Sequence, residues 1–126
     1  MNRNAFQGSA EPTGRMTAWV TSTSQNPSLG TLHAGTYFVR AHCHVTEAFD
    51  SDSTDTITVG YDTDADAFAT SIDVSTTGVK SVTLGTLNGY NGTARAVEAY
   101  YSAGGSAPTQ GKALIILELF RVPSQP

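Results

Sequence analysis

The feature that most constrains the fold is a run of strict alternation between residues 35 and 49. From 37 to 45 its odd positions hold apolar or small side chains, and from 38 to 46 its even positions hold mostly polar ones. Side chains of a β-strand point alternately to its two faces, so this run predicts a long strand with one dry face and one polar face. An acidic stretch, 50–55, and a second alternating run, 56–61, follow directly. Together the three pieces predict a hairpin of two strands joined by an acidic turn.

Alternation recurs along the rest of the chain, with turn residues between the segments. The further segments that fit a strand are 15–21, 71–75, 79–84, 93–102 and 112–122. Many short strands separated by turn signals are typical of sandwiches and jelly rolls. We therefore predict an all-β, single-domain antiparallel β-sandwich, jelly-roll-like, over residues 15–122. An extended N-terminal arm, 1–14, precedes it and a C-terminal tail, 123–126, follows.

The segments between these strands carry expectations of their own. Residues 22–35 are rich in Ser, Asn, Pro and Gly, which predicts a loop held to the core by its two leucines. Residues 62–71 fit either one short helical turn or a loop that places Phe68 inside. Two Asn-Gly pairs between 87 and 92 predict a tight turn.

The final segment, 112–122, is apolar on both faces. A strand of this kind is central in its sheet or is covered on its second side. A short helix is the alternative, but the β-branched and aromatic content and the absence of capping residues favour the strand.

Length, charge and cysteine content exclude several classes of protein. A chain of 126 residues fits one domain with one core. Its net charge of −4, with only seven scattered basic residues, argues against direct binding of nucleic acid. No apolar run is long enough to span a membrane, and the first residues lack the apolar core of a secretory signal, so we expect synthesis in a cytoplasm. Cys43 stands alone, so it forms no intrachain disulfide and fits a buried, inert thiol.

An acid-rich segment is the first candidate for chemistry. Asp62, Asp64 and Asp66 have the Asp-x-Asp-x-Asp spacing of a calcium loop. However, Ala67 occupies the sixth position, where such a loop needs Gly, and the bidentate Glu is absent. Aspartate is also an ordinary turn-capping residue, so a solvated acidic edge is the preferred interpretation. An acidic contact surface for a basic partner is the third possibility, and we expect no cofactor and no metal.

Two histidines are the second candidate. His42 and His44 share one face of the predicted strand and could form half of a zinc site, but a third ligand would have to come from elsewhere, because Glu47 is in the opposite phase and His33 is in a loop. Cys43 points to the other face. A polar strand face or a subunit contact, with a pH-sensitive interface as a minor use, is the preferred interpretation.

Motifs of enzymatic catalysis are missing. The chain has no Gly-x-Ser-x-Gly and no Cys with a neighbouring base, so we predict that it is not an enzyme. Tyrosines could offer stacking surfaces to a carbohydrate, although tyrosines in sheets more often pack across strands. The candidates are Tyr61, Tyr90, Tyr100 and Tyr101.

The order of several short motifs resembles small virion structural proteins of tailed bacteriophages, a group that includes head decoration (cement) proteins. The motifs lie between residues 32 and 122. They are Leu-x-Ala-Gly-Thr at 32–36, Val-Thr-Glu-Ala-Phe at 45–49, Asp-Thr-Ile-Thr-Val-Gly at 55–60, Asp-Ala-Asp-Ala-Phe at 64–68, Asp-Val-Ser-Thr-Thr-Gly-Val-Lys at 73–80, and the last strand after the Gly-rich loop at 104–113.

The resemblance implies a β-sandwich that binds the outer surface of a phage head and stabilises the shell. It implies the major capsid protein as partner, a homo-oligomer (dimer or trimer), and a place on the virion after synthesis in the host bacterial cytoplasm. No catalytic residues come with it. A head–tail connector or tail protein, and a carbohydrate- or calcium-binding β-module, are the alternatives.

Overall fold

The structure is a computed structural model, and it describes residues 14–87 and 89–121. None of these residues lies in a helix, and together they form nine strands. The strands are β1 Gly14–Thr21, β2 Ser28–Leu32, β3 Thr36–Glu47, β4 Asp55–Tyr61, β5 Asp64–Asp73, β6 Gly78–Lys80, β7 Gly89–Asn91, β8 Arg95–Ala103 and β9 Lys112–Arg121.

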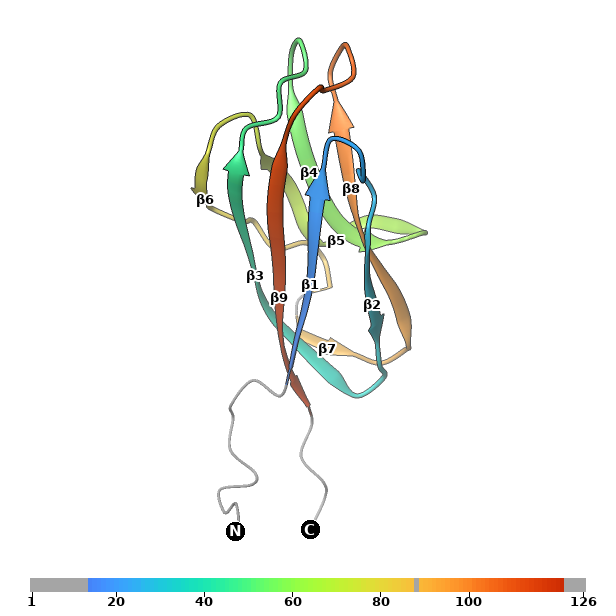
Figure 1. Ribbon diagram of the computed structural model, residues 1–126. Coiled ribbons are helices and arrows are strands. Elements are labelled where there is room, and N and C mark those ends of the chain that lie inside the picture. Colours follow the sequence, from blue (N-terminus) through green and yellow to red (C-terminus); the bar gives the residue numbers. More distant parts are fainter. Residues whose placement is uncertain (1–13, 88, 122–126) are drawn as a thin grey trace, which may run out of the picture.

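The strands form two antiparallel sheets packed face to face (Figure 1). Sheet A has the order β1-β9-β3-β6, and β7 also pairs with β3. Sheet B has the order β2-β8-β4-β5. Strands β1 to β4 alternate between the two sheets, as do β8 and β9. This arrangement is a jelly roll, so the predicted all-β sandwich is confirmed.

The core lies between the sheets and follows the alternation seen in the sequence, except at the start of β3, where a register shift between Phe38 and Arg40 leaves Phe38 buried and Tyr37 on the outer face. In β9, every second side chain from Ala113 to Leu119 is buried. The rings of Phe38, from sheet A, and Phe68, from sheet B, meet edge to face with centroids 5.2 Å apart. Both rings are almost completely buried, so this contact ties the two layers together.

The predicted hairpin of the two long strands is wrong, because its strands lie in different sheets. β3 pairs with β9, β6 and β7, whereas β4 pairs with β5 and β8. The connection between them crosses from sheet A to sheet B and buries Phe49, whose ring stacks on Tyr101 at 4.9 Å between centroids. The dry face of β3 packs on the opposite sheet, and alternation alone does not choose a hydrogen-bonding partner.

Two segments expected to be irregular contain strands. The loop predicted over 22–35 includes β2, although its leucines, Leu29 and Leu32, are buried as expected. The helical turn or loop predicted over 62–71 is instead part of β5, which forms the hairpin with β4. Phe68 is buried as predicted. Pairing along β4 decides the conformation of this Asp- and Ala-rich segment, whose own preference for a strand is weak.

The segment after β6 also differs from its prediction. The strand expected over 79–84 ends at Lys80. The chain then crosses to the edge of sheet B, where Gly85 and Leu87 donate backbone hydrogen bonds to Phe68 and Ala67 of β5. This crossing covers the outer edge of β5, and a sheet edge left open would be a site for unwanted pairing.

The tight turn expected from the second Asn-Gly pair is absent. Asn91 ends β7 and is fully buried. Its side-chain amide donates to the backbone carbonyls of Leu32, at 3.3 Å, and His33, at 3.0 Å. The type I′ turn typical of Asn-Gly needs positive φ at both residues, and no described residue other than glycine has it. Asn91 therefore connects the end of β7 with the end of β2.

Three of the predicted strands agree with the structure. β1, β8 and β9 lie close to their expected ranges, and β9 is central in sheet A between β1 and β3. Of the predicted arm, Gly14 belongs to β1, and residues 1–13 lie outside the described part of the chain, as does the tail after residue 121. The described residues include no helix long and apolar enough to cross a membrane.

Candidate functional site

The outer face of sheet A is the most distinctive surface of the described chain. Residues paired directly across an antiparallel sheet have side chains on the same face, so the register defines which residues lie there. They are Arg15, Thr17, Trp19 and Thr21 of β1, Lys112, Leu114, Ile116, Glu118 and Phe120 of β9, Tyr37, Arg40, His42, His44 and Glu47 of β3, Val79 of β6, and Tyr90 of β7.

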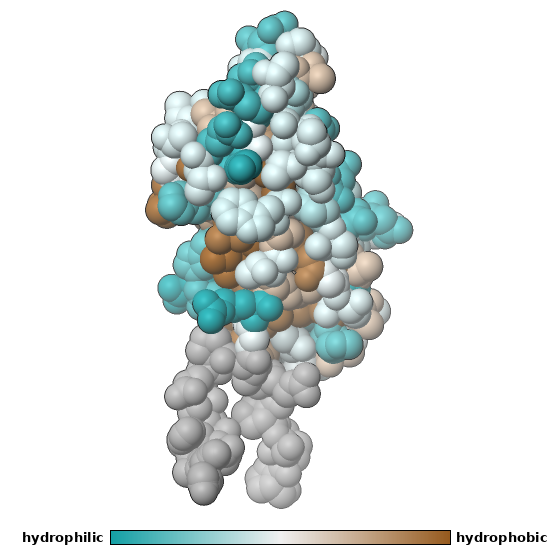
Figure 2. All heavy atoms as spheres, in the orientation of Figure 1, coloured by the Kyte–Doolittle hydropathy of each residue, from teal (hydrophilic) through white to brown (hydrophobic). Residues whose placement is uncertain are grey.

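Apolar side chains form a row across the middle of this face. Trp19 pairs with Leu114, Leu114 pairs with His44, and His44 pairs with Val79. Trp19 is 48% exposed and Val79 is 78% exposed. Figure 2 shows hydrophobic atoms gathered at mid-height over β9 and β3 and on β6, with hydrophilic atoms above and below. An apolar band rimmed by polar groups is typical of a contact surface.

Of the described residues, the other large hydrophobic side chains that are exposed also lie on sheet A. Tyr37 and Tyr90, 43% and 55% exposed, meet edge to face with ring centroids 5.3 Å apart. The outward positions of sheet B, by contrast, hold mainly small or polar residues, among them Thr31, Ser71 and Ser102. The two faces of the sandwich therefore differ, and only sheet A has the character of an interface.

A charged row borders the apolar band. Glu118 pairs with Arg15 on one side and with Arg40 on the other. His42 contacts the Glu118 carboxylate, and this hydrogen bond, supported by the charges of His42, Arg40 and Arg15, holds the pKa of Glu118 below its usual range. A single carboxylate thus lies among three basic side chains.

The predicted histidine half-site has a different setting. His42 and His44 share the outer face, as expected, and Cys43 is buried on the opposite face. Burial raises the pKa of the Cys43 thiol to about 11, and low reactivity of this thiol stays a prediction. His42 is occupied by Glu118, while His44 lies in the apolar row. Among the described residues, no group of three His, Cys, Asp or Glu side chains is placed to hold a metal ion.

Several acidic side chains hold loops in place. Asp50 accepts hydrogen bonds from the Thr109 hydroxyl and from the backbone amides of Thr109, at 2.7 Å, and Gln110, at 3.1 Å. These bonds, the Thr109 hydroxyl first, lower the pKa of Asp50. Asp73 accepts from the Ser75 hydroxyl and amide, which lowers its pKa in the same way. Aspartate has its turn-capping role here.

The calcium candidates lie at the β4–β5 hairpin. Asp62 is exposed in the turn, and Asp64 and Asp66 are the first and third residues of β5. Asp64 accepts a hydrogen bond from the Thr86 hydroxyl at 3.4 Å. Calcium binding by these three residues stays the weaker alternative to a solvated acidic edge.

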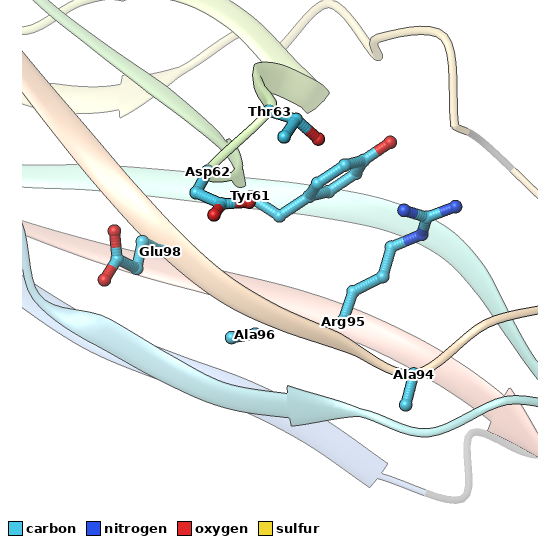
Figure 3. Close-up of a pocket in the computed structure, with 7 residues that line it drawn as sticks. All are labelled: Tyr61, Asp62, Thr63, Ala94, Arg95, Ala96 and Glu98. Atoms are coloured by element: carbon cyan, nitrogen blue, oxygen red, sulfur yellow. The ribbon is translucent and has the colours of Figure 1, made fainter.

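A hollow of about 380 Å³ opens beside this hairpin (Figure 3). The Arg95 guanidinium lies over the Tyr61 ring, 4.2 Å from its centroid, and its Nε donates to Asn91 at 3.1 Å. Asp62 and Glu98 line the other end of the hollow. The Tyr61 face that a sugar could stack on is therefore taken by Arg95.

The four tyrosines proposed as sugar platforms do not come together on one surface. Tyr101 is buried in the core, Tyr90 lies on sheet A, and Tyr61 lines the hollow beside sheet B. Sequence reasoning did not single out the apolar row of sheet A. The signal was present, because Trp19 falls in the polar phase of its strand and Leu114 and Ile116 fall in the second apolar phase of β9.

Comparison with known proteins gives one match, and it is structural. No protein-family model matches the chain, and no curated protein matches it by sequence. Among solved structures, the fold is similar to a chain of the cyanophage Pam1 capsid asymmetric unit, with a TM-score of 0.64 and 15% sequence identity. The alignment covers 95% of this chain and 97% of that one. The two chains are therefore about equal in length and share one fold.

Proposed function

We propose that this chain is a virion structural protein of a tailed bacteriophage, specifically a decoration (cement) protein that binds the outer surface of the head. The observation that carries the proposal is the match, over nearly the full length of both chains, to a chain of a cyanophage capsid asymmetric unit. The order of motifs along residues 32–122 supports it independently. The partners are the major capsid protein and further copies of the chain, and synthesis takes place in the bacterial host.

The surface chemistry supports a binding role without turnover. The apolar row of sheet A offers a contact surface. In the hollow beside Tyr61, Arg95 lies between the Tyr61 ring and the Asn91 amide. The carboxylates of Asp62 and Glu98 lie at the other end of the hollow. Asp50, Asp55 and Asp73 are engaged by loops. These carboxylates hold loops in place, which suits a scaffold.

Stabilisation of the shell follows from mass action. A protein that binds the assembled shell and not its free subunits stabilises the shell by RT ln(1 + [L]/Kd) at each site, which is about 2.7 kcal/mol when the free concentration is 100 times Kd. The stabilisation free energies of the many equivalent sites on a head would add up. No change in shell chemistry is needed.

The test uses heads that lack the protein. Purified chain is added to such heads, and binding is measured by co-sedimentation while the temperature of head disruption is followed by light scattering. We expect saturable binding and a higher disruption temperature. The matched control is Phe68→Asp, because a carboxylate at this fully buried position prevents folding of the sandwich.

Two results would count against the proposal. The first is a folded chain that pellets no more than the Phe68→Asp control, and the second is a chain that pellets at a ratio of only a few copies per head. The second result would favour a connector or tail protein, which occupies one vertex.

A further inference from the structure

The outer face of sheet A approaches the size of a stable interface. Three long strands and the short edge strands give a width of roughly 19 Å, and about eight residues of shared length give roughly 27 Å, so the face covers roughly 500 Å² in projection. Side chains enlarge this area, and a stable interface buries about 800 Å² on each partner. Nothing in the described chain covers the face, and Trp19 at 48% exposure is its largest anchor.

The charges at the two ends of this face are arranged in opposite order. At one end, Glu118 of β9 pairs with Arg40 of β3. At the other end, Lys112 of β9 pairs with Glu47 of β3. Each strand runs from a positive to a negative residue along the chain, and because the two strands are antiparallel their charges lie in opposite order in space. Leu114 and Ile116 lie midway between the two ends.

We propose that the outer face of sheet A binds the same face of a second copy of this chain, related by a two-fold axis that crosses β9 at the level of Ile115. In this arrangement Lys112 lies opposite the partner's Glu118, and Glu47 lies opposite the partner's Arg40. Leu114 packs on the partner's Ile116. The pattern is self-complementary, as an isologous interface requires, and two sheets stacked in this way pack about 10 Å apart.

The other two-fold arrangement is disfavoured by the same charges. If the axis ran along β9, each outward residue of β9 would lie opposite the same residue of the partner. Lys112 would then meet the partner's Lys112, and Glu118 would meet the partner's Glu118. Like charges opposed across an interface cost several kcal/mol. Only the antiparallel stacking brings opposite charges together at both ends.

This dimer leaves sheet B and its loops free to contact other proteins. Sheet B presents mainly small polar residues outward, and the acidic hairpin of β4 and β5 extends from it. The dimer does not depend on the virion role, because it is a property of the chain alone.

The test is a charge-reversal mixing experiment, with mass measured by sedimentation equilibrium in the absence of heads. The wild type, at 13.2 kDa per chain, is expected to be a dimer. Lys112→Glu and Glu118→Lys are each expected to raise the dimer Kd at least about tenfold. Mixed in equal amounts, the two variants are expected to form a heterodimer, because one then offers two carboxylates to two ammonium groups.

Two further variants keep the test decisive. Arg40→Glu and Glu47→Lys form a second pair with the same logic, in case Glu118→Lys fails to fold beside Arg15. Ser102→Glu, a charge added on the exposed outer side of sheet B, is the matched control and should leave the dimer unchanged. Circular dichroism establishes which variants are folded.

A monomeric wild type at about 100 µM would overturn the proposal, as would a trimer. So would folded variants whose mixture stays monomeric. If the chain is monomeric and a Trp19→Ser variant loses head binding instead, the face is the docking site for the shell, and the decoration role would stand without the dimer. A chain that forms the dimer but does not bind heads would leave the dimer standing without the decoration role.

Discussion

Replacing Tyr101 with Phe tests a buried polar contact at the start of β4. The Tyr101 hydroxyl donates to the carboxylate of Asp55, and the two side chains are 9% and 2% exposed. Asp55 also accepts from the Ser51 backbone amide at 3.3 Å. The Phe variant keeps the ring stacked on Phe49 and removes only the hydroxyl, so it leaves a buried carboxylate with one donor fewer.

The expected cost follows from the kind of hydrogen bond. A bond to a charged group contributes about 1.5–3 kcal/mol. Unfolding entropy of about 2.1 cal/mol/K per residue means that 1 kcal/mol lowers Tm by roughly 4 °C in a chain of this length. We therefore expect Tyr101→Phe to lose about 2 kcal/mol of unfolding free energy and roughly 8 °C in Tm.

The assay is urea unfolding at pH 7, with Tyr90→Phe as the matched control. Tyr90 is 55% exposed, so the same deletion there should change the unfolding free energy by less than about 0.5 kcal/mol. Burial and the Asp55 contact raise the pKa of Tyr101 to about 12 from 10.0. The stability that this shift represents is complete below pH 10 and is lost as pH rises through 12. A Tyr101→Phe variant as stable as the Tyr90→Phe control would refute the reasoning.

Three further predictions concern a thiol, a glycine and a loop carboxylate. Cys43, fully buried and with its pKa raised to about 11, should react with a thiol reagent only on unfolding; fast labelling of the folded protein would contradict this. Gly60→Ala should lose at least about 2 kcal/mol in urea unfolding, because the new Cβ would lie 2.1 Å from the Asp64 carbonyl oxygen, whereas Gly14→Ala, with open space around it, should be neutral. Asp50→Asn should be less stable than wild type at pH 7, and because the folded pKa of Asp50 lies below 3.8, the difference should shrink as pH falls below about 4. A difference independent of pH would contradict the last of these.

The sequence predicts the strands better than it predicts their partners. Alternation locates β1, β3, β4, β8 and β9 because one face of each is buried, and that requirement acts residue by residue. Alternation carries no information on which strands are hydrogen-bonded to each other. It therefore predicts a hairpin of β3 and β4, although these strands lie in different sheets. Phe49 marks the crossing, but an aromatic residue after a strand fits a turn equally well.

The candidate surface was only partly predictable for a similar reason. The shared face of His42 and His44 follows from spacing within one strand. The contact of His42 with Glu118 joins residues far apart in the sequence and needs the β3–β9 register. The apolar row from Trp19 to Val79 likewise needs four strands side by side. Short-range patterns cannot supply such cross-strand neighbours.

Immunogold labelling of purified virions tests the central claim most directly. An antibody against the chain, with virions that lack the protein as the control, reports where the protein lies. A decoration protein predicts gold particles distributed over the whole surface of the head. Label confined to one vertex or to the tail, or virions without label, would contradict the decoration role.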